Sequence, residues 1–88
     1  MRYLVIIAKG KRNYSACSPD VLGCATTGKT REEVERRMRE ALEFHLEGML
    51  KDGDPIPEPH TFPDDPEIPH GPNYTPVYMD IRIPNVAA

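Results

Sequence analysis

The distribution of proline limits where this chain can form regular structure. Eight of its ten prolines lie between residues 54 and 76. Proline donates no backbone hydrogen bond and fixes φ, so neither a helix nor an inner strand continues through such a segment. We expect an extended, polyproline-like connection, called here the proline arm (residues 54–76). Regular structure is therefore predicted before residue 54 and after residue 76.

The N-terminal segment is predicted to be a strand with two apolar faces. Residues 2–8 are rich in β-branched and aromatic types and end at a Lys-Gly-Lys sequence. Tyr3, Val5 and Ile7 point to one face, and the apolar residues between them point to the other. A strand of this kind lies in the centre of its sheet or in a subunit contact. We therefore take Tyr3, Val5 and Ile7 as a candidate oligomer contact and expect a dimer or tetramer.

A short meander and one long helix are predicted to follow. Residues 14–18 and 24–27 form two further strands separated by turn-forming Pro, Asp and Gly. Thr30 and Glu33 have the spacing of a capping box, which begins a helix. Apolar residues then recur at steps of three and four. The helix should end near residue 52, because Gly53 and the proline after it favour a C-terminal cap.

The end of the chain contains one more predicted strand. Residues 77–83 alternate strictly between apolar and polar types, which is typical of a half-buried strand. Pro84 stops it, and the proline arm must bring it back to the sheet. The predicted fold is α+β: an antiparallel β-sheet of three to four strands packed on one long α-helix. We expect a single domain, residues 1–88, in which residues 1–53 form a hairpin-plus-helix module.

Charge is distributed unevenly along the chain. Residues 1–53 contain ten Lys/Arg and eight Asp/Glu, a net charge of +2, whereas residues 54–88 contain one Arg and six Asp/Glu, a net charge of −5. An acidic segment repels nucleic-acid phosphates and suits a basic protein partner. A floppy, solvated linker is the alternative interpretation of this segment. The candidate partner-binding residues, called here the acidic surface, are Glu58, Phe62, Asp64, Asp65 and Glu67.

Several motifs, in the correct order, resemble those of HicB-like antitoxins. The family pattern has a Y-x-A strand, then P-D-L-P-G-C, and this chain has YSA followed by PDVLGC. The helix start TGKTREEV and the helix exit DGDPIPEP also resemble the family sequence. The matching segments are residues 3–7, 14–16, 19–24, 25–34, 40–49 and 52–59. The resemblance covers residues 1–59, about two thirds of the chain.

The resemblance implies a fold and a function. It implies a β-β-β-α-β arrangement described as a degraded ribonuclease H-like fold. It also implies a prokaryotic toxin–antitoxin system, in which the antitoxin neutralises a small, basic, RNA-cleaving HicA-type toxin by occlusion. The resemblance also implies a dimer or larger oligomer, and many members of the family carry a C-terminal DNA-binding domain. Only four residues follow Pro84 here, so we expect no direct DNA binding.

Two other functions are alternatives: an orphan oligomeric module with a different partner, and a residual metal-dependent ribonuclease. A ribonuclease H-type site needs three or four converging carboxylates. The strands and turns offer only Asp20 and Asp80, and residues 2–8 offer none. We therefore expect no catalytic residue, metal or cofactor. No secretory signal or membrane span is predicted, so a cytoplasmic protein with free Cys17 and Cys24 thiols is expected.

Overall fold

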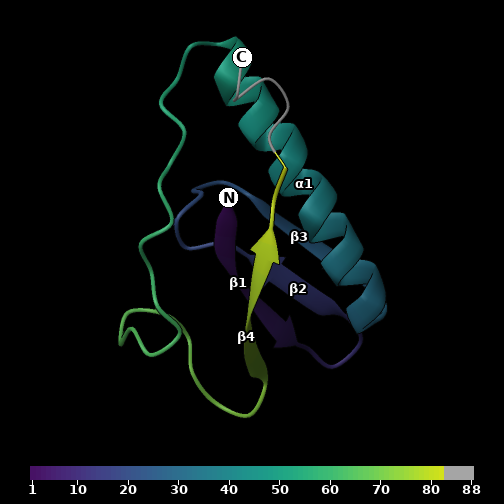
Figure 1. The fold of residues 1–88 in the computed structure, drawn as a ribbon. Coiled ribbons are helices and arrows are strands. Elements are labelled where there is room, and N and C mark those ends of the chain that lie inside the picture. Colours follow the sequence, from purple (N-terminus) through teal and green to yellow (C-terminus); the bar gives the residue numbers. More distant parts are fainter. Residues whose placement is uncertain (83–88) are drawn as a thin grey trace.

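The computed structural model describes residues 1–82 of the chain and shows four strands and one helix. The elements are β1 (Arg2–Lys9), β2 (Tyr14–Cys17), β3 (Ala25–Gly28), α1 (Arg31–Lys51) and β4 (Tyr74–Asp80). The strands form one sheet in the order β3-β2-β1-β4, with every neighbouring pair antiparallel. Figure 1 shows α1 lying diagonally beside the sheet. The proline arm leaves the end of α1, runs past the sheet and leads into β4. The predicted α+β fold is confirmed.

The apolar strand β1 is central because it pairs with β2 on one side and β4 on the other. Its side chains from Tyr3 to Ile7 are all buried. Tyr3, Val5 and Ile7 face α1 and belong to the main core, whereas Leu4 and Ile6 face the other way. The two apolar faces of this strand are thus both covered within one chain.

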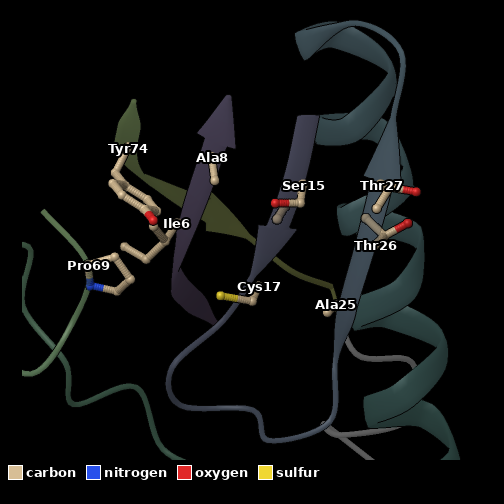
Figure 2. A pocket seen from close by; sticks show the side chains of 10 residues that line it. Ile6, Ala8, Ser15, Cys17, Ala25, Thr26, Thr27, Pro69 and Tyr74 are labelled. Atoms are coloured by element: carbon tan, nitrogen blue, oxygen red, sulfur yellow. The ribbon is translucent and has the colours of Figure 1, made fainter. Parts of the chain in front are cut away.

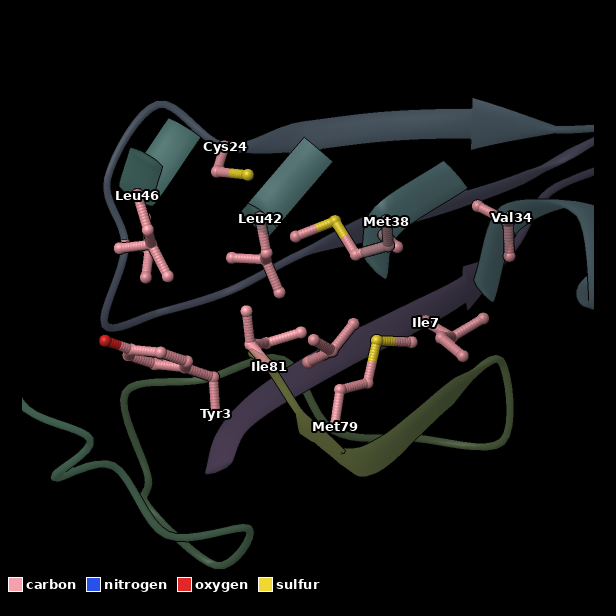
Figure 3. Packing of buried hydrophobic residues seen from close by; sticks show 12 residues of the cluster. Tyr3, Ile7, Cys24, Val34, Met38, Leu42, Leu46, Met79 and Ile81 are labelled. Carbon is pink, nitrogen blue, oxygen red and sulfur yellow. The ribbon is translucent and has the colours of Figure 1, made fainter. Parts of the chain in front are cut away.

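The main core lies between α1 and the sheet. Val34, Met38, Leu42 and Leu46 have no exposed surface and project from α1 toward the sheet. Figure 3 shows them opposite side chains of β1 and of the β4 end, among them Met79. Their spacing of four residues places them on one face of the helix, as the sequence pattern predicts.

Both ends of α1 are capped as its sequence predicts. The Glu33 N–H donates to Thr30 Oγ1 at 3.0 Å. The Glu33 carboxylate reaches back to the N–H of Lys29, at 3.4 Å, rather than to that of Thr30. At the other end Gly53 has φ 76°, and the N–H of Asp54 donates to the carbonyl of Met49 at 2.9 Å. This is the hydrogen-bond pattern of a Schellman cap.

The last strand begins and ends earlier than the sequence pattern predicts. β4 starts at Tyr74, three residues before the predicted start, and contains Pro76 paired with Ile6. An edge strand tolerates proline because only one of its sides needs hydrogen bonds. The strand ends at Asp80, which pairs with Arg2, the first residue of β1. The last predicted strand residue, Ile83, lies outside the described residues.

Hydrogen bonds join the residue before β1 to the residue after β4. The terminal ammonium of Met1 donates to the carbonyl of Ile81 at 2.8 Å, and the N–H of Ile81 donates to the carbonyl of Met1 at 2.6 Å. Ile81 itself is 1% exposed and completes the core. The start and the end of the described chain therefore lie side by side.

Gly28 controls how closely α1 approaches the sheet, and we predict that Gly28→Ala is destabilising. An added Cβ would lie 2.8 Å from the backbone nitrogen of Val34, so the helix start must shift. We expect the free energy of unfolding to fall by roughly 1–3 kcal/mol, as in other overpacked cores. Urea denaturation measures it. Thr27→Ala, at an exposed neighbour on the same strand, is the control and should change stability by less than about 0.5 kcal/mol.

Candidate partner-binding site

The proline arm is docked on the sheet face opposite α1. Ile68 is 8% exposed and packs with Leu4 and Ile6 in a second, smaller cluster. Turn hydrogen bonds shape the arm locally: the N–H of Asp65 donates to the carbonyl of Phe62 at 3.0 Å, and that of Ile68 to the carbonyl of Asp65 at 3.3 Å. The arm is therefore an ordered layer on this face, rather than the floppy linker of the alternative interpretation.

A buried carboxylate fixes the middle of the arm. The side chain of Asp20 has no exposed surface. Asp20 Oδ2 accepts the backbone N–H of His60 at 2.9 Å and that of Thr61 at 3.1 Å. Asp20 Oδ1 accepts the Thr61 hydroxyl and lies 3.0 Å from His60 Nδ1. Residues forty positions apart are thus joined through one side chain, called here the Asp20 clamp.

The electrostatics of the Asp20 clamp favour the charged carboxylate. Burial by itself would raise the pKa of the Asp20 carboxyl. The hydrogen bonds from Thr61 and from the backbone of His60 and Thr61 outweigh that cost and lower the pKa below its usual value. The carboxylate is therefore ionised at neutral pH, and both of its oxygens accept hydrogen bonds from the arm.

A second tie holds the beginning of the arm. The Tyr3 hydroxyl, at the end of an otherwise buried ring, donates to the carbonyl of Pro57 at 2.5 Å. Burial, followed by the nearby Asp20 charge, raises the pKa of the Tyr3 phenol. Tyr3 stays protonated and keeps its donor role. The ring of Tyr3 thus packs in the core, and its hydroxyl binds the arm.

The structure places Tyr3, Val5 and Ile7, the predicted oligomer contact, in the main core. These three side chains are 0%, 0% and 2% exposed and lie beneath α1. Side chains with almost no exposed surface cannot contact a second chain. A subunit contact therefore has to involve other residues. The sequence pattern correctly identified a two-faced strand, but it could not show that α1 and the arm cover both faces.

The acidic surface divides into exposed and structural members. Glu58, Asp64 and Glu67 are exposed, and Phe62 is 67% exposed. Asp65 differs because its Oδ1 accepts the N–H of Glu67 at 2.9 Å and its carbonyl lies 2.8 Å from His70 Nε2. Asp65 therefore shapes the turn that presents the other residues. The exposed members of the acidic surface therefore all lie on one ordered segment, the arm.

A shallow groove of about 630 Å³ crosses the same face of the sheet beside the arm (Figure 2). No lining residue carries a charge, and most are small. Pro69 of the arm and Tyr74 of β4 lie at one end of the groove, and β3 lies at the other. The lining residues are Ile6, Ala8, Ser15, Ala16, Cys17, Ala25, Thr26, Thr27, Pro69 and Tyr74. This uncharged groove adjoins the arm that carries the acidic surface.

The remaining candidate chemical groups lie apart. Cys17 is exposed, Cys24 is buried, both thiols are free, and partial burial raises the pKa of each. Asp80 forms an exposed ion pair with Arg2 at 3.1 Å, whereas the Asp20 carboxylate is buried and binds the arm. Among residues 1–82, no three His, Cys, Asp or Glu side chains are grouped as a metal site. In that same range no helix is long and apolar enough to cross a membrane.

Comparison with known proteins identifies the family. The model of the HicB-like antitoxin of bacterial toxin–antitoxin systems matches residues 3–85. The chain therefore belongs to the HicB-like antitoxin family. An uncharacterized 14.9 kDa protein of Haemophilus phage HP1 is 40% identical over 58 residues, which are 66% of this chain and 44% of that protein. A UPF0150 protein of Thermoplasma acidophilum is 36% identical over 58 residues, 65% of this chain and 84% of its own.

Solved structures share the fold over nearly the whole chain. A chain of the HicA3 and HicB3 toxin–antitoxin complex has a TM-score of 0.71 and 27% identity, covering 93% of this chain and 99% of its own. The antitoxin HicB3 has a TM-score of 0.75 and 26% identity, with 98% of this chain covered and 65% of its own. The Burkholderia pseudomallei antitoxin HicB, at 19% identity and a TM-score of 0.78, covers 92% and 63% and shares the fold. This chain thus spans under half of the phage relative and about two thirds of these two antitoxins.

We predict that Asp20→Asn destabilises the protein in a pH-dependent way. The substitution keeps the shape but removes the charge that accepts the arm's hydrogen bonds, a loss of roughly 1.5–3 kcal/mol at pH 7. Because folding lowers the pKa of Asp20, its contribution is complete above the unfolded value of 3.8 and is lost as pH falls through the folded value. Urea denaturation at pH 7 and pH 3 should show the difference from wild type shrinking.

Asp64→Asn is the matched control, because Asp64 is an exposed acid of the same arm. It should unfold like the wild-type protein at both pH values. An Asp20→Asn deficit that stays constant between pH 7 and pH 3 would contradict the charge-based account of the clamp.

Proposed function

We propose that this protein is an antitoxin that binds a small, basic HicA-type RNase toxin and neutralises it by occlusion, without catalysis of its own. The observation that carries the proposal is the family match over residues 3–85, together with the likeness to a chain of a HicA3 and HicB3 complex. Such a role belongs in the cytoplasm, where RNA substrates are found. The acidic arm supplies the physical basis for choosing a basic partner.

Charge complementarity is the first step of the proposed recognition. Residues 54–88 have a net charge of −5, and Glu58, Asp64 and Glu67 are all exposed. A surface of one sign steers an oppositely charged protein and raises its association rate. A toxin that binds RNA needs cationic side chains for the phosphates. Carboxylates placed against those side chains would compete directly with RNA, which is how occlusion would inhibit.

The order of the arm is the second step. A free, proline-rich segment would lose conformational freedom on binding, and this loss weakens affinity. The Asp20 clamp, the Tyr3 bond to Pro57 and the burial of Ile68 fix the arm beforehand. Phe62, 67% exposed between clamped residues and the Asp65 turn, is then a pre-positioned aromatic anchor of the kind that dominates interfaces.

Co-expression tests the function itself. A small basic protein encoded by the neighbouring gene should arrest growth when expressed alone, and this protein should restore growth and co-purify with it. The complex should also block RNA cleavage by the purified toxin. Growth arrest that persists despite equal expression of this protein would overturn the antitoxin role.

Charge reversal tests the binding surface. Asp64→Lys combined with Glu67→Lys should weaken toxin binding by about tenfold or more at low salt and reduce the salt dependence of affinity. Asp65 is left unchanged because it shapes the turn. Isothermal titration at two salt concentrations measures both effects. Glu32→Lys combined with Glu40→Lys, an equal charge change on exposed positions of α1, is the control.

Equal losses of affinity in the two double variants would show that net charge, rather than the arm, matters. Unchanged affinity and salt slope in the arm variant would place the toxin contact on another surface. Thermal unfolding of both variants verifies that the fold is retained.

A further inference from the structure

The hairpin formed by β1 and β2 ends in a group of cations that the fold does not neutralise. Lys9, Lys11 and Arg12 lie at the hairpin turn, and Lys29 follows β3. These four residues, called here the basic end, are exposed, and none forms an ion pair with a carboxylate of residues 1–82. Five other cations in that range are each paired with an acid: Arg2, Arg31, Arg36, Arg37 and Lys51. The basic end is therefore available to an anionic ligand.

The basic end adjoins the uncharged groove on the sheet. Thr27 lines the groove and also lines a second hollow of about 350 Å³, which contains Arg12 and Lys29. Glu33, the acid of this second hollow, is already paired with Arg37 at 3.1 Å. The charge that remains beside the groove is positive, so the anionic part of a ligand would lie on this side.

One row of side chains across all four strands forms the part of the groove nearest the basic end. The strand register places Tyr74 opposite Ala8, Ala8 opposite Ser15, and Ser15 opposite Thr27. Residues paired in this way point to the same face of a sheet, and all four line the groove (Figure 2). The Tyr74 ring is 39% exposed at one end of the row, and the other three side chains are small and uncharged. Such a surface suits a planar, uncharged group that stacks on the ring.

We propose that the groove and the basic end together bind single-stranded RNA, with an unpaired base on Tyr74 and the neighbouring phosphates on the cations of the basic end. A single strand combines planar bases, which stack on aromatic rings, with a series of negative charges. A double helix does not suit the site, because its bases are stacked on one another and cannot enter the groove. Ser15 and Thr27 supply hydroxyl groups that can hydrogen-bond the ribose 2′-hydroxyl, the group that distinguishes RNA from DNA.

The acidic arm determines on which side the RNA backbone leaves the groove. Pro69 of the arm lies beside Tyr74 at one end of the groove, and Glu67, two residues earlier, is exposed. A carboxylate repels phosphates, so the backbone has to leave on the side of the basic end. The RNA site uses the sheet and the hairpin rather than the acids of the arm. It is therefore independent of the proposed toxin contact and can be tested without a toxin.

Fluorescence anisotropy of the full chain with a labelled, random-sequence RNA of about eight nucleotides tests the proposal. Lys11→Ala combined with Arg12→Ala and Lys29→Ala should weaken binding by about tenfold or more at low salt. Three lost phosphate contacts should also reduce the slope of log affinity against log salt concentration by about 2.

The control removes the same charge from three exposed cations that are already ion-paired. Its substitutions are Arg2→Ala, Arg36→Ala and Lys51→Ala. This variant should keep the wild-type affinity and salt slope. Equal losses in the two triple variants would show that net charge, rather than the basic end, holds the RNA, and would overturn the proposal.

Substitutions at Tyr74 test the stacking contact. Tyr74→Ala should weaken RNA binding by about fivefold or more without changing the salt slope, because it removes a ring and no charge. Tyr74→Phe should bind like the wild-type protein, since stacking needs only the ring. Tyr78→Ala, at a 46% exposed position on the same strand, is the matched control and should also bind normally. Thermal unfolding verifies that each variant is folded.

Cys17 reports whether RNA occupies the groove, because its thiol is free and exposed and the residue lines the groove. Saturating RNA should slow the alkylation of Cys17 by iodoacetamide, whereas the buried Cys24 thiol serves as the internal control. Unchanged alkylation of Cys17 overturns the placement of RNA in the groove. Absence of RNA binding up to about 200 µM protein at low salt overturns the whole proposal. Equal affinity for single-stranded DNA, or displacement of the RNA by polyglutamate at equal charge, overturns the choice of RNA as the ligand.

Discussion

The burial of β1 on both faces is the constraint on which the rest of this structure depends. A strand of consecutive apolar residues at the centre of a small sheet needs two covers, and a chain of 88 residues has few elements to supply them. The helix α1 provides one cover with a continuous aliphatic stripe. The proline arm provides the other, although its backbone forms no ladder there and only Ile68 inserts into the second cluster. The arm is thus a structural layer that covers the second face of β1.

The Asp20 clamp explains how a segment without secondary structure keeps its place. A buried carboxylate without partners would be costly, whereas one that accepts several hydrogen bonds is stable and specific in position. The donors are the backbone N–H groups of His60 and Thr61 and the Thr61 hydroxyl. The polar clamp and the apolar contact of Ile68 act at different points of the arm. Together they give the antitoxin family member a defined acidic surface rather than a fluctuating one.

The sequence predicted the elements that depend on local rules and missed those that depend on distant contacts. The capping pair Thr30 and Glu33, the helix stripe and the glycine after α1 act within a few residues, and all are confirmed. β4 starts earlier than the sequence pattern predicts, because proline breaks most strands whereas an edge position accepts Pro76. The sequence around Asp20 predicts only a turn-forming role for this residue. No local signal links it to residues forty positions away, although an acid within an otherwise apolar loop end is a hint that it has a partner.

The pairing of β1 with β4 joins the first strand of the chain to the last. Because β1 precedes β4 in the chain, this central strand leaves the ribosome earlier and keeps one edge unpaired until β4 has been made. Contacts between residues so distant in sequence also slow folding, because a long loop must close before they form. The protein therefore reaches its final sheet only after the residues of β4 have left the ribosome. A truncated product lacking β4 would expose the unpaired edge of β1, which is prone to aggregation.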